Sequence, residues 1–192
     1  MARPFFRIAC AGASRTGKTT LAEFLSAELQ IPMNPIGSRS VAQAMGFESP
    51  YEVDRAGKRA EFQKRLLTGK QQWEAEHDEF VTDRSTADNL AYTALHEVRS
   101  IDLDTLHTAA EGMDRYTHLF RFSMRTFWKP GSDIARNADW AYSRIYECCL
   151  FGLLDQLRGS ELSILHVPYS DIGKRQTFAL QQLGQPRRPS PI

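Results

Sequence analysis

The chain has 192 residues, of which 42% are hydrophobic and 24% charged, and its formal net charge is +1. This composition suits one globular domain with a sizeable core and argues against disorder. A charge this close to zero excludes a strong whole-molecule attraction to DNA or to an anionic membrane, so a nucleic-acid role would need a local basic patch.

Strand-like and helix-like patterns alternate along the first half of the chain. The apolar run at 5–11 predicts a buried strand, and from Gly17 apolar residues recur every three or four positions, which predicts a helix. Residues 31–38 carry two prolines and a glycine and are assigned a short second strand. A short helix over 39–45, and one or two amphipathic helices within the charged stretch 51–77, complete this half.

The second half continues the alternation with further predicted strands at 80–82, 118–124 and 162–167. The predicted helices between and after them cover 87–99, 102–112, 138–153 and 171–183. Strands that alternate with helices imply a parallel sheet covered on both faces. We therefore predict a single α/β domain over residues 1–184 and a flexible tail at 185–192, where three prolines and two arginines gather.

A glycine-bounded loop at Gly12–Thr19 is the most specific motif, because it matches GxxxxGK[ST] between a predicted strand and a predicted helix. In this pattern the glycines let successive main-chain N–H groups face one anion, and the helix adds the positive end of its dipole. Lys18 would reach the β- and γ-phosphates of a nucleoside triphosphate, and the Thr19 hydroxyl would ligate Mg²⁺. A glycine-rich turn with a surface lysine is the alternative. We assign nucleotide binding to Gly12, Ala13, Ser14, Arg15, Thr16, Gly17, Lys18, Thr19 and Thr20.

A second motif follows the predicted strand at 80–82, where Asp83, Arg84 and Ser85 place an acid, an arginine and a hydroxyl at the strand end. This run resembles the Asp/Glu-Arg-Ser motif of deoxyribonucleoside kinases and the Asp-Arg motif of thymidylate kinases. The longer string at 83–92 (DRSTADNLAY) resembles a phage and bacterial group of small P-loop kinases. That group includes ribosylnicotinamide-kinase-like proteins and phage kinases thought to act on deoxynucleotides or on 5-hydroxymethyluracil within DNA.

The resemblance covers most of the chain and implies a three-layer P-loop NTPase fold with a five-stranded parallel sheet in the order 2-3-1-4-5. It implies ATP and Mg²⁺ as cofactors, Asp83 near Mg²⁺ and the acceptor hydroxyl, and Arg84 on phosphate or the acceptor. Independently, ligands of open α/β sheets collect beyond the carboxyl ends of the strands, where Asp83 and the phosphate loop both fall. The alternative is that Asp83 and Arg84 form a solvated ion pair that opens a helix, since Asp is a good N-cap residue.

The end of the second predicted strand departs from that pattern. Many deoxyribonucleoside kinases carry the general base there, whereas residues 33–40 (MNPIGSRS) contain no acid. Asp83 would then take that role, and Glu48, Glu52 and Asp54 are further candidates. Phosphoryl transfer tolerates a weak base, because positioning and charge neutralisation supply most of the rate.

Residues 125–137 lack apolar periodicity and lie between the fourth predicted strand and the long helix, where nucleotide kinases keep their lid. Closure of a lid excludes water and limits wasteful ATP hydrolysis. We assign Arg136 to the charge that develops on the γ-phosphoryl group, with Arg125, Lys129 and Arg144 as alternatives. An ordinary polar loop is the competing interpretation.

Two further regions are candidates for ligand contact. In the resembling kinases the loop after the fifth strand, here 168–171, lines the adenine pocket, while Ser170 or Asp171 would also serve as a plain helix cap. Acceptor recognition is expected from 36–46 and 51–77, and the latter gathers the basic residues Arg55, Lys58, Arg59, Lys64 and Arg65. Acids offset them, so a solvated helix face is the favoured interpretation, with Phe62 and Trp73 assigned to the core.

Together the motifs predict a kinase that transfers the γ-phosphoryl group of ATP to a hydroxyl of a nucleoside or nucleotide. Phosphorylation of a modified base within DNA, as in phage hypermodification, stays open because the basic cluster and Arg187-Arg188 could hold a polymer. A P-loop ATPase or switch without an acceptor is a third hypothesis. Against it, the sequence shows no apolar-run Walker B acid and no second domain to drive.

Cysteine usage and hydropathy favour a cytoplasmic setting. Three cysteines, of which Cys148 and Cys149 are adjacent, make a poor disulfide framework, and no Cys or His spacing suggests zinc. We see no signal peptide and no run of about 18 apolar residues, so we expect no membrane contact. The expected location is the cytoplasm of a bacterium or of a phage-infected host. The acceptor, the donor base and a homodimeric state stay open.

Overall fold

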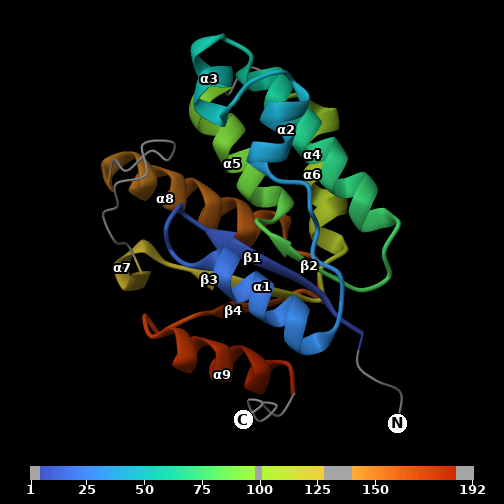
Figure 1. The fold of residues 1–192 in the computed structure, drawn as a ribbon, viewed down its shortest axis with the longest axis vertical. Helices are drawn as coiled ribbons and strands as arrows, with labels where there is room; N and C mark the ends of the chain where they lie inside the picture. Colours follow the sequence, from blue (N-terminus) through green and yellow to red (C-terminus); the bar gives the residue numbers. More distant parts are fainter. Residues whose placement is uncertain (1–4, 98–100, 128–139, 185–192) are drawn as a thin grey trace.

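The computed structural model describes residues 5–97, 101–127 and 140–184 as a layered α/β fold (Figure 1). Its parallel sheet contains β1 (Arg7–Gly12), β2 (Phe80–Asp83), β3 (His118–Phe122) and β4 (Ser163–His166), in the order β2-β1-β3-β4. β1 lies inside the sheet, where Ile8 pairs with Val81 of β2 and His118 of β3. All of β1 except Arg7 is buried, as expected for a strand covered on both faces.

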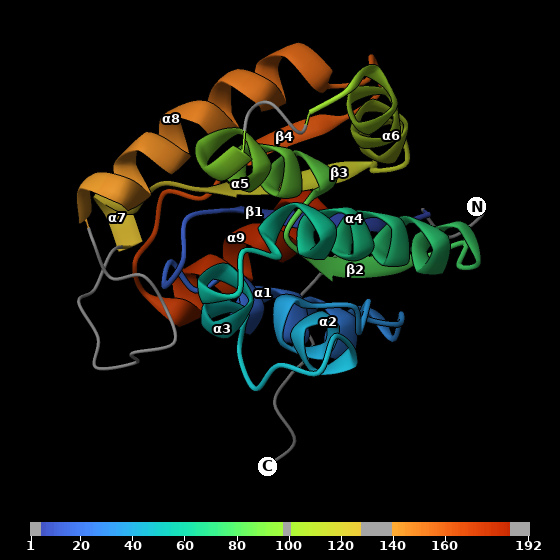
Figure 2. The same ribbon diagram turned by 90° about the horizontal axis from the view of Figure 1, so that it is seen from above.

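Helices cover both faces of the sheet (Figure 2). α1 (Lys18–Leu29) and α9 (Ile172–Gln182) pack on one face, in a core cluster that includes Ile8 and Cys10 of β1. α5 (Thr86–Glu97), α6 (Leu103–Asp114) and α8 (Trp140–Leu157) cover the other face, with Ala9 and Ala11 of β1. Side chains alternate along a strand, so neighbouring residues of β1 divide between the two clusters.

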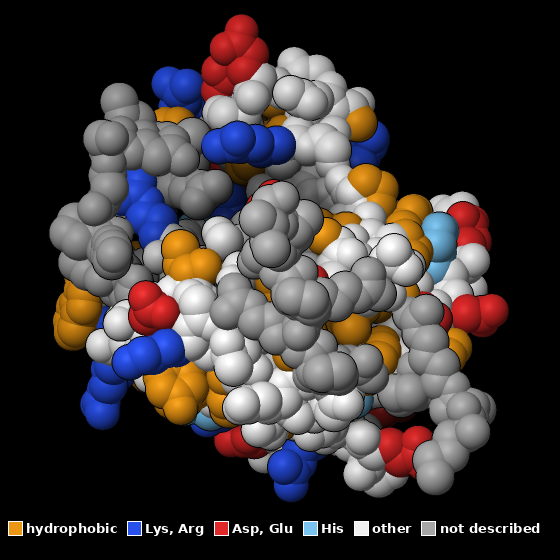
Figure 3. All heavy atoms as spheres, turned by 60° about the horizontal axis from the view of Figure 1, so that its bottom comes forward, with side chains coloured by type: hydrophobic (Ala, Val, Ile, Leu, Met, Phe, Trp, Pro, Cys, Tyr) orange, Lys and Arg blue, Asp and Glu red, His pale blue; other side chains and the backbone are white. Residues whose placement is uncertain are grey.

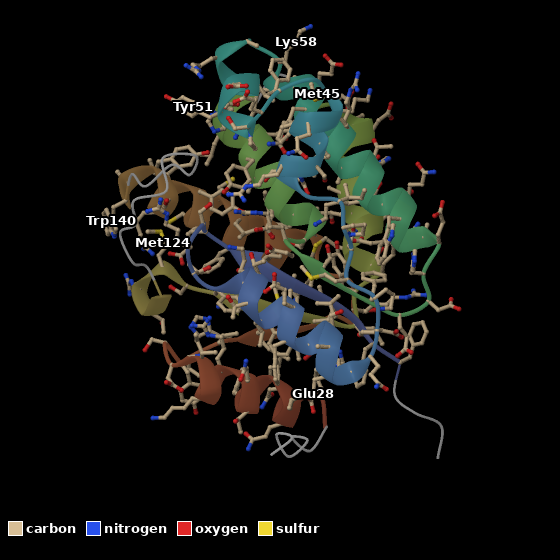
Figure 4. All side chains as sticks on the ribbon, in the orientation of Figure 1. Glu28, Met45, Tyr51, Lys58, Met124 and Trp140 are labelled. Atoms are coloured by element: carbon tan, nitrogen blue, oxygen red, sulfur yellow. The ribbon has the colours of Figure 1, made fainter. Side chains whose placement is uncertain are left out.

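A helical cap rises beyond the sheet and consists of α2 (Ser38–Ala44), α3 (Pro50–Arg55) and the first half of α4 (Arg59–Ala75). Its own small core contains Val41, Val53 and Phe62. Met45, Tyr51 and Lys58 mark this cap in Figure 4. The rest of α4 passes along α5 and α6, so one helix joins the cap to the sheet layers.

The prediction of five strands is wrong, because residues 31–38 form no strand. They meet β2 through a single bridge between Met33 and Val81. Asn34 N donates to Val81 O at 2.8 Å, and Val81 N donates to Pro32 O at 2.9 Å. Pro32 has no N–H to give, which ends the ladder on that side, and on the other side Ile36 N donates to Asn34 Oδ1 at 2.9 Å instead of to β2. The predicted order of the other four strands is confirmed, since the bridge lies on the outer side of β2.

The predicted helices are confirmed to within a few residues at their ends, and the charged stretch 51–77 resolves into α3 and α4. One element was not predicted, the short helix α7 (Met124–Phe127) after β3. Within the described ranges, no helix combines the length and apolar character that a membrane crossing requires. The predicted tail at 185–192 lies outside the described residues.

Candidate functional site

The phosphate loop joins the end of β1 to the start of α1, as the motif predicts. Its main chain curls through the left-handed region at Gly12 (φ 145°), Arg15 (φ 65°) and Gly17 (φ 88°). A side chain at Gly17 would collide with the Arg175 guanidinium, and one at Gly12 would meet the Phe122 carbonyl oxygen at 2.6 Å. Only glycine therefore fits at either end of the curl.

Lys18 is buried at the centre of this loop, with 4% of its surface exposed. Its Nζ donates to the Ala13 carbonyl oxygen at 2.5 Å and to Thr16 Oγ1 at 3.4 Å. Burial, followed by the nearby Arg84 charge, lowers the pKa of Lys18 from 10.5 to about 7. The side chain is thus folded against its own loop, in an environment that would favour a negatively charged ligand.

Thr19 and Asp83 meet across the site, because β1 and β2 end side by side. Thr19 Oγ1 donates to Asp83 Oδ2 at 2.5 Å, whereas Asp83 Oδ1 is buried and has no hydrogen-bond partner in the described structure. Burial by itself raises the pKa of the Asp83 carboxyl, but the charges of Lys18 and Arg84 outweigh it, and the net pKa is lowered. Asp83 is therefore an anion with an unused oxygen.

These two oxygen donors fit Mg²⁺, which prefers hydroxyl, carboxylate and phosphate oxygens. No group of three or more His, Cys, Asp or Glu side chains capable of holding a metal occurs in the described part of the chain. A Mg²⁺ ion here would consequently take Thr19 and Asp83 as protein ligands and complete its shell with phosphate oxygens and water.

Arg84 reaches back from the end of β2 to the phosphate loop. Its Nη2 donates to Ser14 Oγ at 3.1 Å, and its Nη1 lies 3.4 Å from the Gly12 carbonyl oxygen. The guanidinium also lies over the Tyr92 ring, 5.0 Å from the centroid. The alternative of a solvated helix-opening ion pair with Asp83 does not describe these contacts, since the side chain is directed into the loop.

A buried carboxylate that was not predicted, Asp88, organises this corner of the site. Its Oδ1 accepts from Gly12 N at 3.2 Å and from the Tyr146 hydroxyl at 2.6 Å, and lies 3.5 Å from Arg84 Nη1. Its Oδ2 accepts from the main chain and hydroxyl of Ser85. Asp88 belongs to the motif at 83–92, but no sequence signal distinguishes a buried structural acid from a surface acid at this spacing.

Arg175 of α9 is the second residue that the sequence did not indicate. It is buried beneath the phosphate loop, where Nη1 donates to the Gly17 carbonyl oxygen at 3.2 Å and Nη2 to the Ser170 carbonyl oxygen at 2.9 Å. It therefore ties the phosphate loop to the loop after β4. In that second loop Asp171 accepts from Lys174 N at 2.8 Å, which confirms the helix-cap interpretation for Asp171.

The predicted lid falls largely outside the described residues, and Arg136 and Lys129 lie there with it. Of the alternatives to Arg136, Arg125 is exposed on α7, and Arg144 pairs with Glu147 on α8. Glu147 also accepts from Met124 N at 2.6 Å, so it joins α8 to the start of α7. Arg144 is thus paired with the acid that joins α8 to α7.

The basic residues of the helical cap are mostly paired with acids. The ion pairs between residues 52 and 65 include Arg55–Glu52, Lys58–Glu61, Arg59–Asp54 and Arg65–Glu61. Phe62 is buried in the cap core and Trp73 is packed against the sheet core, as predicted. Two of the proposed alternative bases, Glu52 and Asp54, are therefore engaged in these pairs.

The other predicted nucleotide-binding residues lie in or next to the phosphate loop and differ in burial. Thr16 is buried and its hydroxyl donates to the Ala13 carbonyl oxygen at 2.8 Å. Arg15 is half-buried, and Thr20 is exposed on the first turn of α1. Ser14 Oγ lies 3.4 Å from the Tyr92 hydroxyl as well as near Arg84. The structure thus brings the loop, Asp83 and Arg84 together in one place.

The sequence profile of a family described as an AAA domain matches residues 7–171, which contain β1 to β4 and the whole phosphate loop. A comparison with curated proteins found no match.

Solved structures show the same fold. NadR protein in complex with NR shares 15% identity over 96% of this chain, with a TM-score of 0.68, and this chain spans only 51% of the NadR chain. Thymidylate kinase from Candida albicans shares 15% identity, with coverage of 96% and 93% and a TM-score of 0.59. Deoxyadenosine kinase from M. mycoides with bound dCTP shares 13%, with coverage of 92% and 98% and a TM-score of 0.58. The predicted resemblance to P-loop kinases is therefore confirmed at the level of the fold.

Proposed function

We propose that this chain, which belongs to the AAA-domain family matched over residues 7–171, is an ATP-dependent kinase that phosphorylates a hydroxyl of a nucleoside or nucleotide. The phosphate loop supports the nucleotide part of this proposal. Kinase activity requires in addition a side chain that can orient the hydroxyl of an acceptor beside the triphosphate.

The observation that carries the proposal is the hydrogen bond of 2.5 Å between Thr19 Oγ1 and Asp83 Oδ2. This bond brings a charged carboxylate from the neighbouring strand directly beside the hydroxyl that P-loop proteins use for Mg²⁺. Because P-loop ATPases and switches also hold Mg²⁺ with such an acid, the choice of a kinase comes from the thymidylate kinase and the deoxyadenosine kinase among the similar structures. Mg²⁺, when bound, would neutralise charge on the β- and γ-phosphates. Lys18 would add its own charge to the same phosphates, and Asp83 would accept a hydrogen bond from the attacking hydroxyl.

Asp83 and Arg84 would orient the acceptor hydroxyl and contact the charged groups around it. The lowered pKa of Asp83 makes it a weak base, so it would orient the acceptor hydroxyl more than remove its proton early. Arg84 lies between the phosphate loop and Tyr92, where it can contact an anion or the acceptor. The site would then act chiefly by positioning and charge neutralisation.

A nucleoside or nucleotide is the favoured acceptor. The similar structures include a thymidylate kinase and a deoxyadenosine kinase, and the arginines of the cap that a polymer would need are paired with acids. No observation in the described residues favours phage origin or a modified DNA base, and that alternative stays a prediction. We likewise propose ATP as the donor and Arg136 as the lid arginine.

The test is to incubate the protein with Mg²⁺, γ-labelled ATP and a panel of nucleosides, nucleotides, ribosylnicotinamide and hydroxymethyluracil-containing DNA. We expect the label to enter a small acceptor. Label in the DNA would instead support the modified-base alternative. Release of labelled phosphate with every acceptor unlabelled would support an ATPase or switch and would refute the kinase proposal.

A further inference from the structure

Lys70 is buried in α4 although its side chain carries an amine, with only 2% of its surface exposed. Its Nζ donates to the main-chain carbonyl oxygens of Asp83, at 3.0 Å, and of Arg84, at 2.7 Å. Burying an amine is costly unless its N–H groups are satisfied. Lys70 is therefore tied to the turn that carries both proposed catalytic side chains from β2.

That turn holds a conformation that a non-glycine residue avoids. Arg84 has a φ of 80°, in the left-handed region, which costs roughly 1–2 kcal/mol for an L-residue. Arg84 N donates to the Cys10 carbonyl oxygen at 2.9 Å, so the turn is bound to β1 on one side and to Lys70 on the other. In this conformation Asp83 points at Thr19, while the Arg84 side chain turns back to Ser14.

Glu74, one turn further along α4, supplies a buried negative charge that attracts Lys70. Its carboxylate accepts from Asn34 Nδ2 at 3.1 Å and from the Tyr116 hydroxyl at 3.2 Å, and it is as deeply buried as Lys70. Burial lowers the pKa of Lys70 and raises that of Glu74, and their mutual attraction opposes both shifts. In either protonation state Nζ keeps at least two N–H groups, enough for the two carbonyls.

We propose that Lys70 is a positioning residue of the kinase site: by holding the carbonyls of Asp83 and Arg84, it keeps the Asp83 carboxylate directed at the Mg²⁺ position beside Thr19. This inference rests on the proposed function for its meaning in catalysis. The physical effect is on metal-dependent nucleotide binding, which can be measured without any acceptor. Lys70 itself touches neither the phosphate loop nor a reacting group in the contacts described.

The test compares Lys70→Met with Lys64→Met, an exposed lysine of the same helix, in titrations with a fluorescent ATP analogue. In EDTA, we expect the affinity of Lys70→Met to equal that of the wild type. The Mg²⁺ concentration that half-saturates the metal-dependent increase in affinity should rise about 10-fold or more, as for loss of other residues that orient metal ligands. Lys64→Met should match the wild type in both measurements.

If Lys70→Met leaves the buried charge of Glu74 uncompensated, the protein would unfold, so the test includes a second variant. Lys70→Met/Glu74→Gln removes both groups without a large change in volume, and circular dichroism would report its folding. An unchanged Mg²⁺ dependence in a folded variant, or equal losses of affinity with and without Mg²⁺, would overturn the proposal. Failure of the double variant to fold would also overturn it, because Lys70 would then serve the fold rather than the position of Asp83.

Failure of the proposed function would look different. If the wild type phosphorylated no acceptor yet bound ATP with the Mg²⁺ dependence described, the kinase assignment would fail. The role of Lys70 in directing Asp83 would still be decided by the same titrations.

Discussion

Lys18 is the residue whose protonation depends most on what the phosphate loop holds. Its pKa of about 7 belongs to the protein without nucleotide, where burial disfavours the ammonium. A triphosphate would supply negative charge beside Nζ and raise this pKa again. Above pH 7, binding should therefore be accompanied by protonation of Lys18.

We predict that ATP binding takes up about one proton at pH near 8.5, and that ATP affinity falls as the pH rises above 7. Calorimetric titrations in buffers with different heats of ionisation would measure the uptake. Lys64→Met, which removes an exposed lysine, should leave it unchanged. Binding without proton uptake at this pH would contradict the assigned environment of Lys18.

Asp83 gives the sharpest test of the catalytic assignment. Asp83→Asn keeps the shape of the side chain but removes the charge that Thr19 and Mg²⁺ would face, so kcat should fall about 100-fold or more. ATP affinity in EDTA should change little. The matched control is Asp78→Asn, at an exposed carboxylate just before β2. Full activity in Asp83→Asn would remove Asp83 from the mechanism.

At the scale of single residues, the sequence predicted the site residues that belong to a recognisable motif and missed those that do not. Lys18 and Thr19 were predicted because residue type and spacing follow from phosphate and Mg²⁺ chemistry, and Asp83 because the run at 83–85 resembles a motif of small P-loop kinases. Asp88 and Arg175 were not, because their roles come from burial beside the loop, and burial of a charged residue cannot be read from its immediate neighbours. The sequence did not distinguish Lys70 from the exposed charges of the amphipathic stretch 51–77 either, because its burial is not visible in the sequence.

Among the elements, α9 has a function beyond covering the sheet. It carries Arg175 to the carbonyl oxygens of Thr16 and Gly17, on the side of the phosphate loop away from Asp83's strand. Arg15 is the non-glycine residue of the loop that holds a strained left-handed conformation, and these bonds to the two residues that follow it help to keep it there. The last helix should therefore contribute to nucleotide affinity.

We predict that Arg175→Met weakens ATP binding about 10-fold, since hydrogen bonds from a charged donor are worth roughly 1.5–3 kcal/mol. Equilibrium titration with an ATP analogue would measure this, together with the melting temperature. Lys174→Met, the exposed neighbour on the same helix, should bind ATP as the wild type does. Equal affinity in both variants would show that α9 does not support the loop.

The elements also show where sequence patterns are ambiguous. Hydrophobic periodicity predicted α1, α5, α8 and the four strands, because each has one or two faces in a core cluster. The segment 31–38 has the apolar residues of a strand, but it also contains Pro32 and Pro35. Since proline has no backbone N–H to donate, the segment pairs with β2 through a single bridge and forms no strand. α7 is too short to have a recognisable period.

Across the whole molecule the formal net charge is +1, and in the cap the charge is also balanced locally. In the face shown in Figure 3, Lys and Arg side chains lie mainly towards the top and left, and Asp and Glu side chains mainly at the right and at the edges. The basic residues of the cap are paired with acids. A polymer would therefore find little unpaired positive charge on the cap.

We therefore predict no gel shift of duplex DNA, with or without hydroxymethyluracil, at about 0.1 M salt, where several phosphate contacts would be needed for tight binding. A control titration with ATP on the same preparation would show that the protein is folded and binds nucleotide. A tight shift that weakens steeply with added salt would contradict this and would favour the modified-base acceptor.

The most direct test of the central claim, that this site transfers phosphate to an acceptor, is the stoichiometry of the reaction with its best acceptor. ADP, inorganic phosphate and phosphorylated acceptor would be quantified together over one time course. We predict that the acceptor accelerates ATP consumption and that one phosphorylated acceptor appears for each ADP. Equal amounts of ADP and inorganic phosphate, formed at the same rate whether or not an acceptor is present, would contradict the account.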